Sequence, residues 1–205
     1  LKTKKDNVQK GSMKSPINIE TKDADLCPVF AGRYFKGVKN VQSPDWLQQK
    51  LKAVGLRPIS ALVDITNFVM LDLNRPLHVY DADKIDGKII VRQSKKGESF
   101  NALDEKSYDL KEGMCAIADE KKVLGLGGIM GGESSGCNES TKNVLLESAL
   151  FNPINIAKSG RNLSILSDAR YRFERGVDPQ SVLIGIDRAT ELISEICGEI
   201  GRAHV

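Results

Sequence analysis

The stretch that decides the fold class spans residues 88–151 and contains the apolar runs KIIVRQ (88–93), MCAIAD (114–119), KVLGLGGIMGG (122–132) and NVLLESALF (143–151). Each run has the length of a β-strand, and residues that favour turns (Gly, Asn, Asp and Ser) separate the runs. We therefore predict that this part of the chain is rich in β-strands.

Segments before residue 88 are predicted to add further strands and a helix. INIETKD (17–23) alternates apolar and polar residues, and VFAGRYFKGV (29–38) is bounded by turn residues, so both are predicted to be strands. SPDWLQQKLKAVGL (43–56) has Ser43 as a candidate N-cap and Gly55 as a stop signal. This pattern predicts a helix.

Three more helices are predicted, over roughly residues 64–73 with Asp64 as the cap, 153–160 and 179–198. The fold class is therefore α+β: a layered, mixed or antiparallel, β-sandwich-like core that is flanked by helices. Residues 1–16 are rich in Lys and poor in apolar residues, which predicts a flexible tail or linker stub. Residues 17–205 are predicted to form a single domain.

Length and composition limit the class of protein. The 205 residues slightly exceed one typical domain of about 150, and 40% hydrophobic with 28% charged residues is typical of a globular chain. No apolar run approaches the roughly 18 residues of a membrane-spanning helix, and LKTKKDNVQK at the start lacks the apolar stretch of a signal peptide. We predict a cytoplasmic location without membrane contact. The first residue, Leu1, indicates a piece of a longer subunit.

Charge and cysteine usage argue against two further classes. A net charge of +3 is too small to imply nucleic-acid binding from bulk charge, so any such contact must be local. The four cysteines form no CxxC pair, and the chain has only two histidines, so no metal site is predicted. The cysteines are predicted to be reduced thiols.

The glycine-rich stretch GLGGIMGGESSG (125–136) resembles two phosphate-binding motifs but fits neither. Gly127 and Gly132 have P-loop spacing, yet Glu133 follows where that loop needs Lys. The third glycine of a dinucleotide fingerprint is replaced by Met130. We therefore predict that these glycines serve a tight turn or the close approach of another backbone.

Several polar groups have both a structural and a functional interpretation. Alternation places Glu147 on one face of a strand with Leu145 and Ala149, so either that face is solvated or a carboxylate is buried. His78 follows a proline in a loop-like stretch and is either structural or directed into a cleft. Thr66 and Asn67 either cap a helix or line a polar pocket.

The segment SGRNLSILSDARYRFERGVDP (159–179) mixes basic and aromatic residues, which suits phosphate and ribose contacts. Acidic residues are interleaved with them, so a solvated face with internal ion pairs is the alternative. The arginines concerned are Arg161, Arg170, Arg172 and Arg175.

Taken together, four stretches occur in a specific order: residues 43–81 (SPDWLQQKLKAVGLRPISALVDITNFVMLDLNRPLHVYD), 127–133 (GGIMGGE), 145–151 (LLESALF) and 167–179 (SDARYRFERGVDP). In these motifs the chain resembles the editing domain of the β subunit of bacterial phenylalanyl-tRNA synthetase. The resemblance runs from about residue 32 to about residue 179.

The resemblance implies a domain that hydrolyses tyrosine wrongly attached to phenylalanine-specific tRNA. It implies the tRNA acceptor end and the α subunit of the parent heterotetramer as partners. It also implies no cofactor in this domain, with ATP and magnesium used elsewhere in the parent synthetase. The catalytic residues that it implies are His78, Thr66 and Asn67. The substrate-binding residues that it implies are Glu147, which meets the ring hydroxyl, and Gly131, Ala169, Ser167 and Arg57. Arg170, Arg172 and Arg175 are the predicted tRNA contacts.

The chain departs from the family pattern near the predicted site. Leu166 and Ser167 stand where the family has His-Thr, and Arg170 and Tyr171 stand where it has Ser-His. Because no Ser-His-Asp set or reactive cysteine is available, we expect water to attack the ester carbonyl. The alternative is a non-catalytic module that docks tRNA or scaffolds the subunit, with a decayed editing site.

Overall fold

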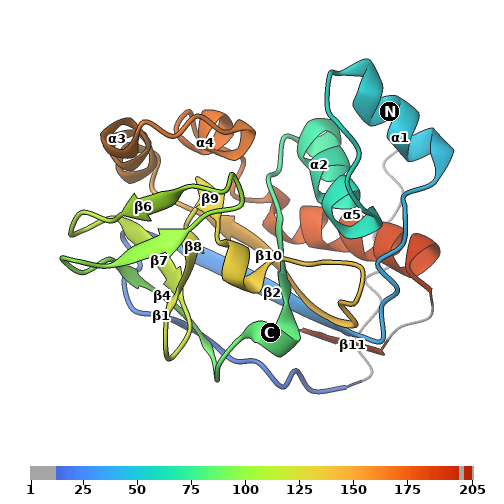
Figure 1. The fold of residues 1–205 in the computed structure, drawn as a ribbon, viewed down its shortest axis with the longest axis horizontal. Helices are drawn as coiled ribbons and strands as arrows, with labels where there is room; N and C mark the ends of the chain where they lie inside the picture. Colours follow the sequence, from blue (N-terminus) through green and yellow to red (C-terminus); the bar gives the residue numbers. More distant parts are fainter. Residues whose placement is uncertain (1–12, 199–200, 205) are drawn as a thin grey trace.

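The computed structural model describes residues 13–198 and the backbone of residues 201–204. Two large sheets and one hairpin make up its β structure (Figure 1). The five-stranded sheet has the order β1 (Ile19–Thr21), β4 (Ile89–Gln93), β7 (Cys115–Ala118), β8 (Val123–Leu126) and β9 (Met130–Gly131). The four-stranded sheet has the order β11 (Gly201–His204), β2 (Val29–Lys36), β10 (Asn143–Leu150) and β3 (His78–Asp81). The hairpin pairs β5 (Ser99–Asn101) with β6 (Ser107–Asp109).

Five α-helices accompany the sheets in the described residues: α1 (Asp45–Ala53), α2 (Ala61–Leu73), α3 (Pro153–Leu163), α4 (Asp168–Phe173) and α5 (Ser181–Ile196). Two short 3-10 helices, η1 (Ala82–Lys84) and η2 (Glu133–Ser135), lie in connections. None of the helices between residues 13 and 198 is long and apolar enough to cross a bilayer.

Strand β10 separates two hydrophobic cores because successive side chains of a strand point to opposite faces. Leu145 and Ala149 belong to the core between the two sheets, together with residues of β4, β7 and β8. Val144 and Leu146 belong to the second core, together with residues of the helices. The predicted α+β class with a sandwich-like, mixed core is therefore confirmed, as is the predicted alternation along β10.

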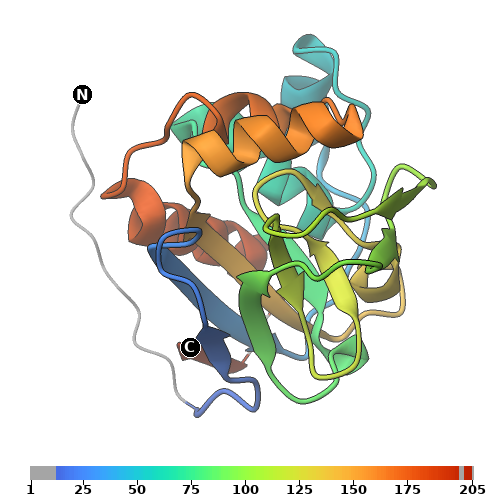
Figure 2. The same cartoon turned by 90° about the vertical axis from the view of Figure 1, so that its left-hand side faces the viewer.

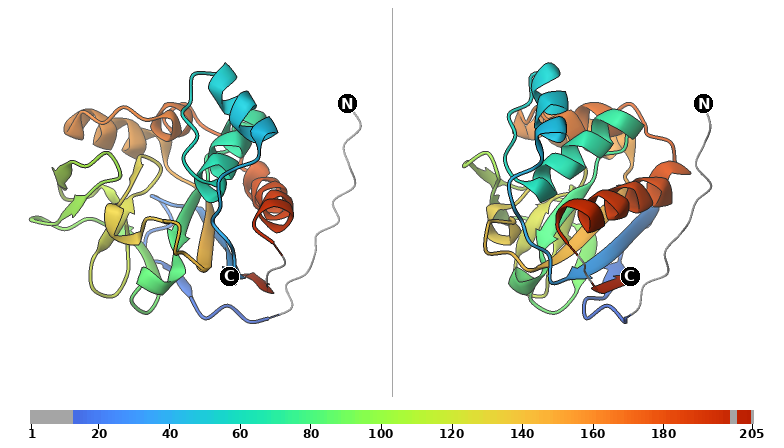
Figure 3. Two further views of the ribbon diagram at one scale, coloured as in Figure 1. Left: turned by 45° about the vertical axis from the view of Figure 1, so that its right-hand side comes forward. Right: turned by 90° about the vertical axis from the view of Figure 1, so that its right-hand side faces the viewer.

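The second core lies between the four-stranded sheet and helices α1, α2 and α5. Figure 3 shows α2 and α5 side by side over this sheet, with α1 above them. The apolar positions that make the contact recur at helical spacing, which gives each helix one buried stripe. They include Leu47 and Leu51 of α1, Leu62, Ile65 and Val69 of α2, and Ile186, Ala189 and Ile193 of α5.

Helices α3 and α4 cover one end of the first core. Figure 2 shows α3, in orange, lying across the top of the view above the strands. Phe173 of α4 packs edge-on against Phe151, with 5.1 Å between the ring centroids. This contact closes the space between the sheets at the end where β10 finishes.

The two predicted helix starts near residues 43 and 64 are wrong in detail. Helix α1 has Pro44 as its N-cap, and α2 begins at Ala61, three residues before the predicted cap. The reason is a long-range pairing: the Ser43 hydroxyl donates to the Asp64 carboxylate at 2.5 Å, and the Ile59 N–H donates to it at 2.8 Å. Asp64 is therefore buried inside α2, where it joins the starts of both helices.

Several elements were not predicted from the sequence, among them the hairpin strands β5 and β6 and the edge strand β11. His78 begins strand β3 and does not lie in a loop, and residues 168–173 form the short helix α4. Most of the predicted tail, residues 1–16, falls outside the described residues, although Met13 packs against the first core. The four cysteines are free, as predicted.

Arg75 connects the start of β3 to its surroundings. Its side chain is fully buried; Nε donates to the Ser181 hydroxyl at 2.8 Å, and Nη1 donates to the Ala149 carbonyl at 2.7 Å. Nη2 donates to the Asp178 carbonyl. Gly185 leaves the room, since a Cβ there would lie 2.6 Å from Arg75 Cγ. One guanidinium thus holds together the approach to β3, the end of β10 and the start of α5.

Replacement of Arg75 is expected to destabilise the domain. Arg75→Ala leaves two buried acceptors, the Ser181 hydroxyl and the Ala149 carbonyl, without this donor, so the free energy of unfolding should fall by about 3 kcal/mol or more in urea denaturation. Arg188→Ala is the matched control, because Arg188 is a half-exposed arginine of α5 that pairs with Glu191 at 3.1 Å. That control should cost less than about 0.5 kcal/mol. Equal losses in the two variants would contradict the role given to Arg75.

Candidate functional site

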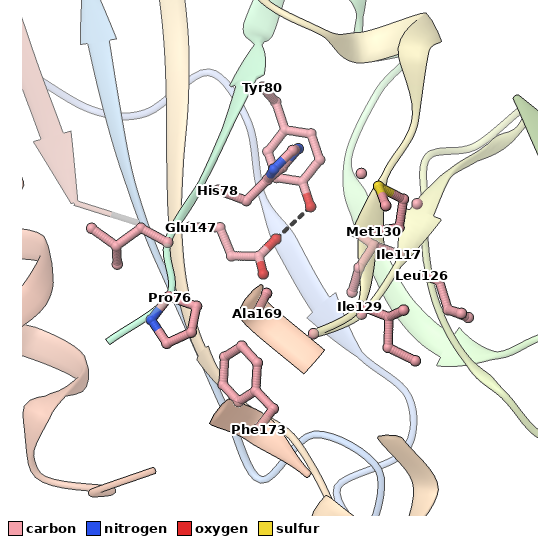
Figure 4. A pocket seen from close by; sticks show the side chains of 15 residues that line it. Pro76, His78, Tyr80, Ile117, Leu126, Ile129, Met130, Glu147, Ala169 and Phe173 are labelled. Carbon is pink, nitrogen blue, oxygen red and sulfur yellow. Dashed lines mark hydrogen bonds between the residues drawn. The ribbon is translucent and has the colours of Figure 1, made fainter. Parts of the chain in front are cut away.

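A cavity of about 80 Å³ lies between the two sheets, beside α4. Its walls come from the start of β3, the centre of β10, the glycine-rich turn after β8, and α4 (Figure 4). The lining residues are Pro76, Leu77, His78, Tyr80, Ile117, the run from Gly125 to Gly131, Glu147, Ala169 and Phe173. Four predicted site residues are therefore brought together: His78, Gly131, Glu147 and Ala169.

Glu147 is the acidic residue among those that line the cavity. It lies on β10 opposite His78 of β3 and Gly32 of β2, and only 7% of it is exposed. The Tyr80 hydroxyl donates a hydrogen bond to Glu147 Oε2 (Figure 4). This settles the structural question that the sequence left open: the carboxylate is inside, and the face of β10 that carries it is not solvated.

Burial controls the charge of the groups that face the cavity. It raises the pKa of Glu147 to about 7, and the hydrogen bond from Tyr80 opposes this rise. Burial also raises the pKa of Tyr80, and the nearby Glu147 carboxylate raises it further. Burial lowers the pKa of His78 to about 4. At neutral pH the imidazole is therefore uncharged, and Glu147 lies close to the midpoint of its titration.

The His78 ring is fixed on two sides. It packs edge-on against Tyr80, with 4.4 Å between ring centroids, and it lies against Gly131. A Cβ at position 131 would lie 2.4 Å from His78 Cε1. His78 Nε2 is buried without a hydrogen-bond partner, which leaves a polar atom able to bind a ligand or water.

The glycine-rich turn serves close approach, as predicted. A Cβ at Gly132 would lie 2.5 Å from the Leu124 carbonyl oxygen, and one at Gly125 would lie 3.0 Å from the Met130 carbonyl oxygen. A Cβ at Gly128 would meet the Phe151 ring at 2.8 Å, and this residue has a positive φ of 68°. The turn can therefore lie against the Phe151 ring and the neighbouring strand backbone only because its glycines lack side chains.

Ser167 lies outside the cavity and positions α4. Its hydroxyl donates to the Ile129 carbonyl at 2.7 Å and accepts from the Arg170 N–H at 3.0 Å, which makes it the N-cap of the helix. Ala169 follows on the first turn and reaches the lining. Ser167 thus joins α4 to the glycine-rich turn, and the small side chain of Ala169 leaves room in the cavity.

Thr66, Asn67 and Arg57, which the resemblance implies as site residues, do not line the cavity. Thr66 is buried on α2 and donates to the Val63 carbonyl at 2.8 Å. Asn67 is half-buried on the same helix, and Arg57 is exposed in the loop before it. The physical reason is that α2 packs against the face of the four-stranded sheet opposite to Glu147.

The predicted tRNA-contacting arginines differ in exposure. Arg170 is buried, donates to the Ile165 carbonyl at 2.6 Å and pairs with Glu174 at 3.0 Å, so it is used inside the domain rather than at its surface. Arg172 pairs with Asp168 at 3.0 Å. Arg175 is 54% exposed at its side chain, and its guanidinium lies 3.8 Å from the centre of the Tyr171 ring. Of these three arginines, Arg175 has the side chain most exposed to solvent.

Tyr80 is the site residue that the sequence interpretation missed. It is the second residue after His78, and this spacing places both residues on one face of β3 once the segment is recognised as a strand. Within residues 13–198 no cluster of three or more His, Cys, Asp or Glu side chains is arranged to hold a metal ion.

Comparison with known proteins shows the family of the chain. Residues 26–198 match the family described as the B3/4 domain, so the chain belongs to this family. It is 57% identical over 189 residues to the phenylalanine–tRNA ligase β subunit of Bradyrhizobium diazoefficiens, and 56% identical to that of Rhodopseudomonas palustris. Each alignment covers 92% of this chain and 24% of the relative, so the chain spans about a quarter of these proteins.

A solved structure shares the fold. It is the crystal structure of an N-terminal fragment of the phenylalanyl-tRNA synthetase β subunit from Pyrococcus horikoshii, which superposes with a TM-score of 0.62 at 16% identity. The match covers 94% of this chain and 52% of that fragment. From its identity to the two relatives, the chain is homologous to part of the β subunit of phenylalanine–tRNA ligase, an enzyme of translation.

Glu147→Gln is expected to stabilise the domain at alkaline pH. Because the folded-state pKa is raised from 4.5 to about 7, ionisation opposes folding, and stability falls as pH rises through about 7. The substitution should raise the free energy of unfolding by up to about 3 kcal/mol at pH 8 and change it little at pH 4.5. Glu139→Gln, at an exposed position, should be neutral at both pH values. A pH-independent effect of Glu147→Gln would contradict the raised pKa.

Proposed function

We propose that this chain is a tRNA-editing domain that hydrolyses the ester of tyrosine wrongly attached to phenylalanine-specific tRNA. The observation that carries the proposal is the buried Glu147 carboxylate in a small, mostly apolar cavity. An aromatic side chain fits apolar walls, and a phenol supplies the hydrogen bond that a buried carboxylate needs. The family membership supports the same assignment, since the relatives are named as subunits of a phenylalanine–tRNA ligase.

The need for such a site follows from the limits of binding. A pocket made for phenylalanine rejects tyrosine weakly, because it must exclude only one added hydroxyl. A second site that forms a hydrogen bond to the hydroxyl can favour tyrosine over phenylalanine by roughly 10⁴ or more. The reason is that phenylalanine, which lacks the hydroxyl, leaves a buried polar group of the site unpaired. In this proposal Glu147 reads the hydroxyl, while Gly131 and Ala169 leave the room that the ring occupies.

The hydrolytic step uses water as the nucleophile. His78 is uncharged at neutral pH and has an unpartnered Nε2, so its imidazole orients water or the ester at the rim of the cavity. Thr66, Asn67 and Arg57 lie outside the lining of this cavity, and their predicted roles stay predictions. No cofactor is required in the domain; ATP and magnesium serve the synthetic reaction of the parent enzyme. The partners are the acceptor end of the tRNA, with Arg175 as the accessible cation, and the α subunit.

The alternative is a non-catalytic module that docks tRNA or scaffolds the subunit, and two observations favour it. Tyr80 already donates to Glu147, and the cavity volume of about 80 Å³ is smaller than an engineered cavity of about 150 Å³ that binds benzene. The test uses phenylalanine-specific tRNA that carries tyrosine. Its deacylation is measured with the complete synthetase, assembled from full-length subunits. Hydrolysis above the spontaneous rate supports editing, and its absence supports the module.

Glu147→Ala should lose preference for the tyrosine ester more than it loses hydrolysis. A hydrogen bond to a charged acceptor contributes about 1.5 to 3 kcal/mol, so the ratio of deacylation rates for tyrosine and phenylalanine esters should fall by roughly 10- to 100-fold. Glu139→Ala is the matched control, because it removes an exposed glutamate. An unchanged ratio in Glu147→Ala would remove this residue from recognition of the hydroxyl.

His78→Ala should slow deacylation of both esters to a similar extent, by about 10- to 100-fold, because orientation of the reacting groups is lost. His78→Asn retains a hydrogen-bonding side chain and should recover part of the rate. The measurement is single-turnover deacylation, with thermal unfolding as the check that each variant is folded. A rate equal to that of the unmodified enzyme would exclude His78 from the mechanism.

A further inference from the structure

Tyr80 and Glu147 form a buried pair that precedes any ligand. Tyr80 is 2% exposed, on β3 next to the strand of Glu147, and its hydroxyl donates to Glu147 Oε2. The His78 ring packs edge-on against the Tyr80 ring, which restricts the phenol to this position. The phenol is therefore a fixed part of the site.

The carboxylate retains a second acceptor atom. A carboxylate has two oxygens with about four lone-pair sites, and the bond from Tyr80 uses Oε2. The other oxygen points away from Tyr80, toward the side of the cavity formed by Ala169 and Phe173 (Figure 4). One oxygen is thus held by the protein, and the other faces the space where a ligand would lie.

Within residues 13–198, the titratable groups that interact with Glu147 supply no positive charge. They are His78 and Tyr80 from β3, Cys115 from β7, and Cys27 from the segment before β2. Burial lowers the pKa of His78 and raises the pKa of both thiols and of Tyr80, so all four are uncharged at neutral pH. The Tyr80 hydroxyl is the neighbour whose hydrogen bond favours the ionised carboxylate.

We propose that Tyr80 is a positioning residue for specificity: its hydroxyl holds Glu147 Oε2 and thereby presents the other oxygen, as an ionised acceptor, to the phenol of an incoming amino acid. The inference rests on the proposed editing function and deepens it, because it assigns the discrimination between a phenol and a phenyl ring to a pair of residues. An ionised acceptor binds a phenol more strongly than a neutral carboxylic acid does. Discrimination should therefore increase as pH rises through the titration of Glu147.

The test is Tyr80→Phe in the complete synthetase, with Tyr108→Phe as the matched control. Tyr108 also donates to a carboxylate, Asp104 at 2.7 Å, but on the β5–β6 hairpin outside the cavity lining. Two quantities are measured over a pH series. The first is the ratio of the deacylation rate of the tyrosine ester to that of the phenylalanine ester. The second is the ratio of the dissociation constant of tyrosyl-adenosine to that of phenylalanyl-adenosine, with an amide in place of the ester in both analogues.

In Tyr80→Phe the ratio of deacylation rates should fall about tenfold at neutral pH, and the ratio of dissociation constants should rise about tenfold, because both changes report a lost preference for tyrosine. The pH at which discrimination develops should move upward by about one unit. The pH shift is the readout that a merely structural role would not change. Tyr108→Phe should leave both ratios and their pH dependence unchanged. Thermal unfolding checks that each variant is folded.

Two results would overturn the inference while leaving the editing function intact. If the original protein prefers the tyrosine ester and Tyr80→Phe keeps the same ratio and pH profile, Tyr80 does not position Glu147. If the ratio of deacylation rates for tyrosine and phenylalanine esters rises in Tyr80→Phe, the Tyr80 phenol competes with the ligand for Glu147. If the original protein itself shows no preference in either rate or binding, the proposed function fails, and the inference fails with it.

Discussion

The burial of one carboxylate between two sheets is the constraint on which the site depends. Glu147 lies on the inner face of β10, where its neighbours on the strand, Leu145 and Ala149, are core residues. Ionisation of a buried carboxyl group costs free energy, because the charge loses its contact with water. The raised pKa of Glu147 reflects this cost. Groups with strongly shifted pKa values concentrate at functional sites, which makes this face of the sandwich the candidate functional face.

The surrounding structure serves to bring other groups up to that carboxylate. Arg75 holds the start of β3 against the end of β10, where the register places His78 opposite Glu147 and Tyr80 opposite Leu145. Ser167 ties α4 to the glycine-rich turn through the Ile129 carbonyl. Each of these contacts joins segments far apart in the chain, so the geometry of the cavity is a property of the whole domain.

Absence of side chains matters as much as their presence in this site. Gly131 lets the His78 ring approach the turn, and Gly128 lets the turn pass over the Phe151 ring. The remaining space is small, and Tyr80 takes up one oxygen of the carboxylate. The walls of the cavity are close-packed, so their side chains have little room to move. A difference of a few atoms in a ligand therefore decides whether the ligand fits.

The sequence by itself determined the fold class, the position of most strands and helices, the close-approach role of the glycines and the face of β10 that carries Glu147. These features follow from local periodicity and turn chemistry, which act over a few residues. Only the tertiary structure decided the partners of each polar group. It buried Arg170, placed Thr66 and Asn67 on a helix behind the sheet, and joined Tyr80 to Glu147. The physical reason is that periodicity shows which residues share a face, whereas strand register and helix packing, set by contacts distant in sequence, determine which faces meet.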